Sequence, residues 1–208
     1  MTPRSRLLLI LGLAVAIFGG GALALTLVEQ SAEPAAVAVD TASGAAIGGP
    51  FTLVDARGQT VTDRNFHGKW MLVYFGYTFC PDVCPTTLTN IAQALVQLRS
   101  HATDLLPVFI TIDPQRDTPK VMGDYVKAFD PRIVGLTGSK AQIAKVAQEY
   151  HVYYAKQANS GSGDDYLVDH SSFVYLMSPQ GKFAKVMPGS LSAGEMADAI
   201  RPFLESTS

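Results

Sequence analysis

The strongest structural signal in the chain is an apolar run, Trp70–Phe75, that leads into two cysteines and then into an amphipathic segment. A run of this kind is typical of a strand that is covered on both faces. The apolar residues of Thr86–Leu98 recur at helical spacing, which predicts a helix. Cys80 and Cys84 stand between the two elements. Their thiols must therefore lie where a buried strand ends and a helix begins.

Strand-like and helix-like segments alternate along the rest of the chain. We predict further strands at 51–54, 60–61, 105–112, 133–136, 152–155, 173–177 and 183–186, further helices at 118–129, 139–150 and 192–204, and a loop at 157–165. This order indicates an α/β fold with a central mixed β-sheet flanked by helices. A cysteine pair at a helix start, followed by a closing hairpin and helix, is the order of thioredoxin-like proteins, although periodicity alone does not require that fold.

The N-terminal segment Leu7–Val28 carries no charged residue. As a helix it would be about 33 Å long, which is enough to cross the hydrocarbon core of a bilayer. Arg4 and Arg6 precede it, and basic flanks stay on the cytoplasmic side. We therefore predict a single-pass protein of the inner membrane whose globular domain faces the periplasm. The predicted parts are a cytoplasmic N-terminus at 1–6, a transmembrane anchor at 7–28, a flexible tether at 29–49 and the domain at 50–205.

A cleaved signal peptide is the alternative interpretation of the same segment. Ala22-Leu23-Ala24 provides small residues of the kind found at a cleavage site. The apolar region of a signal peptide is usually about 7–15 residues, which is shorter than this run. Both interpretations place the domain outside the cytoplasm.

Charge and cysteine content exclude two classes of protein. The formal net charge is −2, so no basic excess favours a nucleic-acid partner. The chain has two cysteines only, and the domain is long enough to bury a core without disulfide staples. The two thiols are therefore expected to do chemistry.

The spacing of Cys80 and Cys84 corresponds to about one helical turn, which can turn both sulfurs the same way. Pro85 suits the first turn of a helix, where its missing N–H costs little. The positive end of the helix dipole would favour the thiolate form of Cys84.

Three interpretations of the pair remain open at this point. A structural disulfide would close a very short loop and stabilise little. A redox dithiol is possible, although such proteins usually have Cys-x-x-Cys, one residue shorter. In a soft-metal site, two thiolates and one imidazole would suit copper, whereas zinc would prefer a fourth ligand.

The four histidines, His67, His101, His151 and His170, cannot be ranked by composition. His170 is distinguished by position, because it directly precedes the predicted strand at 173–177. In a thioredoxin-like sheet that junction lies beside the cysteine loop.

Three stretches of the chain resemble the Sco/SenC family, copper-binding proteins that are needed for cytochrome c oxidase assembly. They are GYTFCPDVCPTTL at 76–88, TIDPQRDTP at 111–119 and YLVDHS at 166–171. Their order and spacing agree with the family, and the resemblance extends over about 47–204. The first stretch is highly specific, and the other two are strong in combination.

The resemblance implies that Cys80, Cys84 and His170 bind copper, as Cu(I) and as Cu(II). It also implies that Asp113 and Asp169 contact the ligands and not the metal itself. A carboxylate such as Asp169 can orient a ligating imidazole. We interpret Arg116 and Asp117 as pairing with each other or capping the helix at 118–129.

The function implied by the resemblance is that of a copper metallochaperone. Its partners would be subunit II of cytochrome c oxidase, which receives the metal at its binuclear copper centre, other periplasmic copper chaperones, and the membrane itself. A thiol-disulfide oxidoreductase that reduces the cysteines of the oxidase copper site is the alternative, because the same two thiols serve both chemistries. A peroxidase is disfavoured, because peroxiredoxins rely on one activated cysteine and this chain has a pair.

Overall fold

The computed structural model describes residues 46–157 and 165–205. Its strands are β1 (Thr52–Asp55), β2 (Thr60–Thr62), β3 (Trp70–Gly76), β4 (Leu105–Thr111), β5 (Val134–Thr137), β6 (Tyr154–Lys156), β7 (Val168–His170), β8 (Phe173–Met177) and β9 (Phe183–Pro188). Its helices are α2 (Val83–Leu98), α3 (Pro119–Lys127), α4 (Lys140–Glu149) and α5 (Ala193–Glu205), with 3-10 turns at Asp63–Phe66 and Arg99–Asp104.

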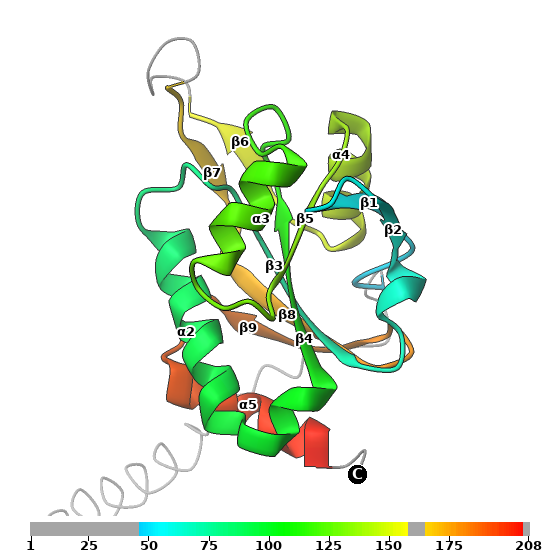
Figure 1. Cartoon of the computed structure of the whole chain (residues 1–208), viewed down its shortest axis with the longest axis vertical. Coiled ribbons are helices and arrows are strands. Elements are labelled where there is room, and N and C mark those ends of the chain that lie inside the picture. The colour runs from blue at the N-terminus through cyan, green and yellow to red at the C-terminus, as the bar shows by residue number, and fades with distance from the viewer. Residues whose placement is uncertain (1–45, 158–164, 206–208) are drawn as a thin grey trace, which may run out of the picture. The chain divides into compact units, whose positions relative to one another are not determined.

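Seven strands form one sheet in the order β2-β1-β5-β4-β3-β8-β9 (Figure 1). Strands β3, β4 and β5 are parallel, and β1, β2, β8 and β9 join them antiparallel to their neighbours. The predicted mixed sheet with flanking helices is therefore confirmed. Strand β3 lies between β4 and β8, and all seven of its residues are buried.

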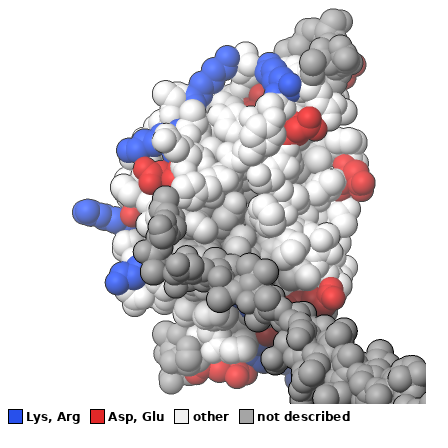
Figure 2. Space-filling model, turned by 180° about the vertical axis from the view of Figure 1, so that it is seen from behind, with Lys and Arg blue, Asp and Glu red and all other residues white. Residues whose placement is uncertain are grey.

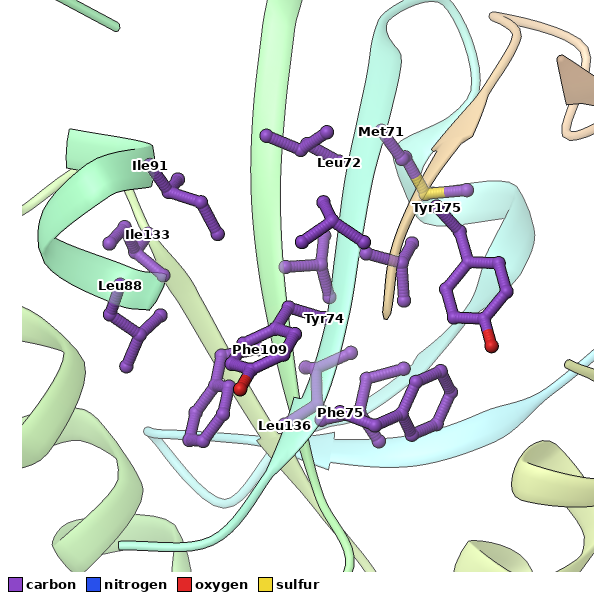
Figure 3. Close-up of a cluster of buried hydrophobic side chains, with 14 of the residues drawn as sticks. Met71, Leu72, Tyr74, Phe75, Leu88, Ile91, Phe109, Ile133, Leu136 and Tyr175 are labelled. Atoms are coloured by element: carbon purple, nitrogen blue, oxygen red, sulfur yellow. The ribbon is translucent and has the colours of Figure 1, made fainter. Parts of the chain in front are cut away.

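Alternate residues of β3 point to opposite faces of the sheet. On the side of α2 and α3, the ring of Tyr74 lies beside that of Phe109, with 5.8 Å between their centroids (Figure 3). On the opposite side, which α4 covers, Phe75 packs against Tyr150 and Tyr175. Helix α5 packs against α2. The sheet is thus covered on both faces, which accounts for the near-continuous apolar sequence of its central strand.

Two details differ from the sequence prediction. Helix α2 begins at Val83, three residues before the predicted start, so Cys84 lies within its first turn. A second, two-stranded sheet pairs β6 with β7, a strand that was not predicted from the sequence, and His170 is the last residue of β7. A strand of three residues is too short to show a period, so only its pairing with β6 reveals it.

The predicted anchor at 7–28, most of the predicted tether and most of the loop at 157–165 lie outside the described residues. No helix within 46–157 and 165–205 combines the length and the apolar character that a membrane crossing needs. On the face shown in Figure 2, Lys and Arg side chains are interspersed with Asp and Glu.

Candidate metal centre

The fold brings Cys80, Cys84 and His170 together at the end of β3. One ligand atom from each residue, the two sulfurs and an imidazole nitrogen, lies within 4.8 Å of the others. The Sγ atom of Cys84 is 3.4 Å from Nε2 of His170, across 86 positions of sequence. The three residues predicted as ligands therefore share one site.

The local backbone explains how the two sulfurs converge. After β3 the chain turns, with the Cys80 N–H donating to the carbonyl of Tyr77 at 3.3 Å. The Cys84 N–H then donates to Sγ of Cys80 at 3.4 Å. A sulfur thus accepts from one of the backbone N–H groups that the first turn of a helix leaves without an intrahelical partner. Both cysteines are free thiols.

The orientation of His170 suits metal binding through Nε2. Its Nδ1 atom lies 3.1 Å from the carbonyl oxygen of Ser171. A neutral imidazole that donates from Nδ1 to this carbonyl directs the Nε2 lone pair at the sulfurs. The rings of Tyr74 and Tyr77 make T-shaped contacts with the imidazole, with ring centroids 6.4 and 6.1 Å away.

The two thiols differ in their acidity. Hydrogen bonding from Cys84 lowers the pKa of the half-buried Cys80 thiol well below its usual range, and His170 and nearby backbone N–H groups add to this effect. The hydrogen bond to Cys80 raises the pKa of Cys84, and burial adds to the rise. The prediction that the helix dipole favours a Cys84 thiolate is therefore wrong. Cys84 is fully buried, and desolvation combined with its role as donor to Cys80 outweighs the dipole.

A cavity of about 230 Å³ opens beside the cluster, and its lining includes Cys80, Val83, Gln157 and His170. A larger cavity of about 390 Å³ shares Val168 with it but includes none of the three converging residues. We assign the site to the smaller of these two cavities, because its lining includes Cys80 and His170.

The two aspartates predicted to support the ligands have different partners. The carboxylate of Asp169 accepts from Nε2 of Gln157 at 2.7 Å. The buried carboxylate of Asp113 accepts from Nε of Arg116 at 2.5 Å and from the hydroxyl of Tyr166 at 2.7 Å. Neither contact reaches a sulfur or the imidazole directly. Their supporting roles stay predictions.

The interpretation of Arg116 and Asp117 as a pair or a helix cap is wrong. Arg116 pairs with Asp113, and Thr118 caps α3. Asp117 is fully buried and accepts hydrogen bonds from the Thr78 N–H, the Thr78 hydroxyl and the Thr111 hydroxyl. It holds the start of the cysteine loop to the end of β4. No local pattern marks this role, because Thr78 lies 39 positions away and Thr111 lies in a different element.

The donor set agrees with the chemistry of copper. Two sulfurs suit Cu(I), and an imidazole nitrogen suits Cu(II). A closed tetrahedral zinc site would need a fourth ligand. Within the described part of the chain, the cluster contains three ligand side chains and no fourth. Cys80 is only partly buried and lines the cavity, which leaves the site accessible from it.

Comparisons with known proteins agree with this geometry. The family model described as SCO1/SenC matches residues 39–205. The mitochondrial SCO1 homolog 1 of Arabidopsis thaliana is 45% identical over 161 residues, which are 77% of this chain and 48% of that protein. A SCO2-like protein of Rickettsia prowazekii is 40% identical over 155 residues, 74% of this chain and 76% of that protein. The chain thus spans about half the length of the plant relative.

Solved structures show the same fold. A crystal structure of Arabidopsis thaliana ScoI with copper bound has a TM-score of 0.73 and 42% sequence identity, and the match covers 77% of this chain and 99% of that one. Yeast Sco1 with copper bound has a TM-score of 0.71 and 39% identity, with 77% and 90% covered.

Proposed function

Because this chain belongs to the SCO1/SenC family, we propose that it is a copper metallochaperone that holds one copper ion between Cys80, Cys84 and His170. The observation that carries this proposal is the convergence of two sulfurs and one imidazole within 4.8 Å. Relatives with 42% and 39% identity have been solved with copper bound, which supports the choice of metal.

The two oxidation states of copper would use the site differently. Cys80 and Cys84 belong to one loop and helix start, so the two sulfurs alone can hold Cu(I). Cu(II) gains from the harder nitrogen of His170. A site with few ligands and one accessible sulfur releases its metal by ligand exchange, which is what delivery to another protein requires.

We propose that the receiver is the binuclear copper centre of cytochrome c oxidase subunit II and that other periplasmic copper chaperones supply the metal. The uncharged segment Leu7–Val28 supports a membrane anchor, with the domain in the periplasm. A tethered domain searches only the space near the membrane surface, which raises its effective concentration at a membrane-bound oxidase.

A spectroscopic titration tests the metal site. The full chain is purified in detergent, reduced and mixed with one equivalent of Cu(II), and visible absorption and electron paramagnetic resonance are recorded. We expect sulfur-to-copper charge-transfer bands with mixed sulfur and nitrogen coordination. Cys80→Ser, Cys84→Ser and His170→Ala should each abolish or strongly weaken Cu(II) binding, whereas the exposed histidine variant His67→Ala should bind like wild type. Equally tight binding by His170→Ala would remove that residue from the site.

A thiol-disulfide oxidoreductase is the second candidate, and the acidity of the thiols favours it. The Cys80 thiolate would attack a substrate disulfide and form a mixed disulfide. Cys84 would then displace the substrate, which leaves a Cys80–Cys84 disulfide and a reduced substrate dithiol, with the protons taken from the Cys84 thiol and from solvent. Rapid reduction of a disulfide by a chain that forms no stoichiometric copper complex would favour this function over the first.

A further inference from the structure

Arg116 lies among three aromatic rings beside the metal centre. The carbon of its guanidinium is 3.7 Å from the ring centroid of Tyr166, 4.7 Å from that of Phe79 and 5.7 Å from that of Tyr77. Only 13% of the Arg116 side chain is exposed. Contacts between a cation and a ring strengthen where water is excluded. The guanidinium is therefore held firmly in this position.

Hydrogen bonds reinforce the stack on one side. Nη1 of Arg116 donates to the backbone carbonyl of Tyr166 at 2.9 Å. Nε of Arg116 and the Tyr166 hydroxyl both donate to the carboxylate of Asp113. Close by, the backbone N–H of Val168 donates to the Tyr77 hydroxyl at 3.2 Å. The planar guanidinium can stack and donate at the same time, which a lysine ammonium cannot do.

The three aromatic rings in this stack belong to the two segments that carry the metal ligands. Phe79 directly precedes Cys80 in the cysteine loop. Tyr166 leads into β7, which ends at His170. Arg116 comes from a third segment, the connection between β4 and α3, and contacts both. It is thus placed to determine how far the imidazole lies from the two sulfurs.

We propose that Arg116 is a positioning residue that clamps the cysteine loop against the strand carrying His170 and thereby makes the site competent for Cu(II). This inference rests on the proposed copper-binding function and specifies which part of it Arg116 supports. Cys80 and Cys84 stay together without the clamp, because only three residues of one loop and helix start separate them. Only the placement of His170 relative to the sulfurs depends on it.

The consequence is a selective effect on the two oxidation states. Mutation of a residue that orients a metal ligand typically lowers metal affinity by about 10–100-fold. We expect Arg116→Lys and Arg116→Gln to weaken Cu(II) binding by about that factor. Cu(I) binding should stay close to wild type, because it relies on the two sulfurs.

The experiment compares both affinities in the full chain in detergent. Cu(II) affinity is measured by competition with a Cu(II) chelator, Cu(I) affinity by competition with a Cu(I) chelator, and nitrogen hyperfine structure by electron paramagnetic resonance. Arg57→Lys is the matched control, because Arg57 also pairs with an aspartate, Asp55 at 2.9 Å, but in a different part of the fold. The thermal midpoint of the metal-free proteins monitors folding.

The outcomes separate the inference from the proposed function. Loss of Cu(II) affinity and of the nitrogen hyperfine pattern in both Arg116 variants, with Cu(I) binding preserved, would support the clamp. Wild-type Cu(II) affinity in Arg116→Lys would overturn it, because charge alone would then suffice. Equal losses of Cu(I) and Cu(II) binding would also overturn it. Absence of a stoichiometric complex in the wild-type chain would instead overturn the proposed function.

A second variant covers the case in which the Arg116 variants do not fold. Phe79→Leu removes one ring of the stack, and the ring is 48% exposed, so the core is untouched. We expect the same selective loss of Cu(II) affinity, smaller in size. Unchanged Cu(II) affinity in Phe79→Leu, with a native thermal midpoint, would contradict the clamp.

Discussion

Gly76 leaves the space that the Cys84 sulfur occupies. A Cβ added at Gly76 would lie 2.7 Å from Sγ of Cys84 and 2.8 Å from the ring of Phe109. The last residue of β3 therefore contributes to the metal centre through the absence of a side chain. Neither neighbour can move away easily, because both are fully buried.

Gly76→Ala should destabilise the domain and displace the sulfur. Overpacking of a filled core typically costs about 1–3 kcal/mol. We expect a decrease of that size in the free energy of unfolding, measured by chemical denaturation, together with a shifted sulfur-to-copper absorption band. Gly194→Ala is the control. Gly194 lies in helix α5, and a Cβ added there would lie 3.6 Å from the Gln97 side chain, an ordinary contact distance. That change should stabilise by up to about 1 kcal/mol. A stable Gly76→Ala protein with an unchanged spectrum would show that the space is not required.

The two thiols should react with an alkylating reagent at different pH. The thiolate is the reactive form, so the lowered pKa of Cys80 keeps it reactive at mildly acidic pH, where an ordinary thiol is protonated. The raised pKa and burial of Cys84 should restrict its reaction to alkaline or unfolding conditions. Peptide mass spectrometry after brief iodoacetamide treatment of the reduced, metal-free chain measures both rates. Denatured protein, in which both sites should react alike, is the control. Faster labelling of Cys84 at acidic pH would reverse our assignment of the thiolate.

Asp117 should make the stability of the domain depend on pH. Burial raises the pKa of this carboxyl above its ordinary value, although the hydroxyls of Thr111 and Thr78 partly offset the effect. A raised folded-state pKa contributes stability below the unfolded pKa, and this contribution is lost as pH rises through the folded pKa. Asp117→Asn cannot ionise, so its stability relative to wild type should increase from acidic to neutral pH. The change should be about 1.4 kcal/mol for each unit by which the pKa is raised.

Denaturant titrations of both proteins across that pH range measure the difference. Asp124→Asn serves as control, because Asp124 is exposed and its ion pair with Lys120 lowers its pKa. Its contribution therefore has the opposite sign and is lost as pH falls. A constant difference between Asp117→Asn and wild type at all pH values would show that Asp117 is ionised in the same way in the folded and unfolded chains.

Local patterns in the sequence were enough to predict much of the architecture. The apolar run of β3, the helical stripe of α2, and the paired strands β8 and β9 all appear where expected. These features arise from interactions within a few residues or from the burial of one or both faces of an element, which leave a periodic or a continuous apolar pattern in the sequence. The cysteine spacing likewise follows from one turn of chain.

The identity of the third residue in the cluster depended on the tertiary structure. His170 is the last residue of β7, which pairs with β6, and the fold brings its imidazole to Cys84 across 86 positions of sequence. Sequence position and family resemblance suggested His170, but no local period distinguishes it from His67, His101 or His151.

The ionisation of the thiols and the partners of Arg116 and Asp117 were also beyond local patterns. The helix dipole favoured a Cys84 thiolate, yet burial and the hydrogen bond to Cys80 reverse that preference. Both effects depend on which groups the packed fold brings together and on how far it excludes water, and neither leaves a period in the sequence. Short-range periodicity records which residues are buried, whereas only the packed fold determines what each buried group contacts.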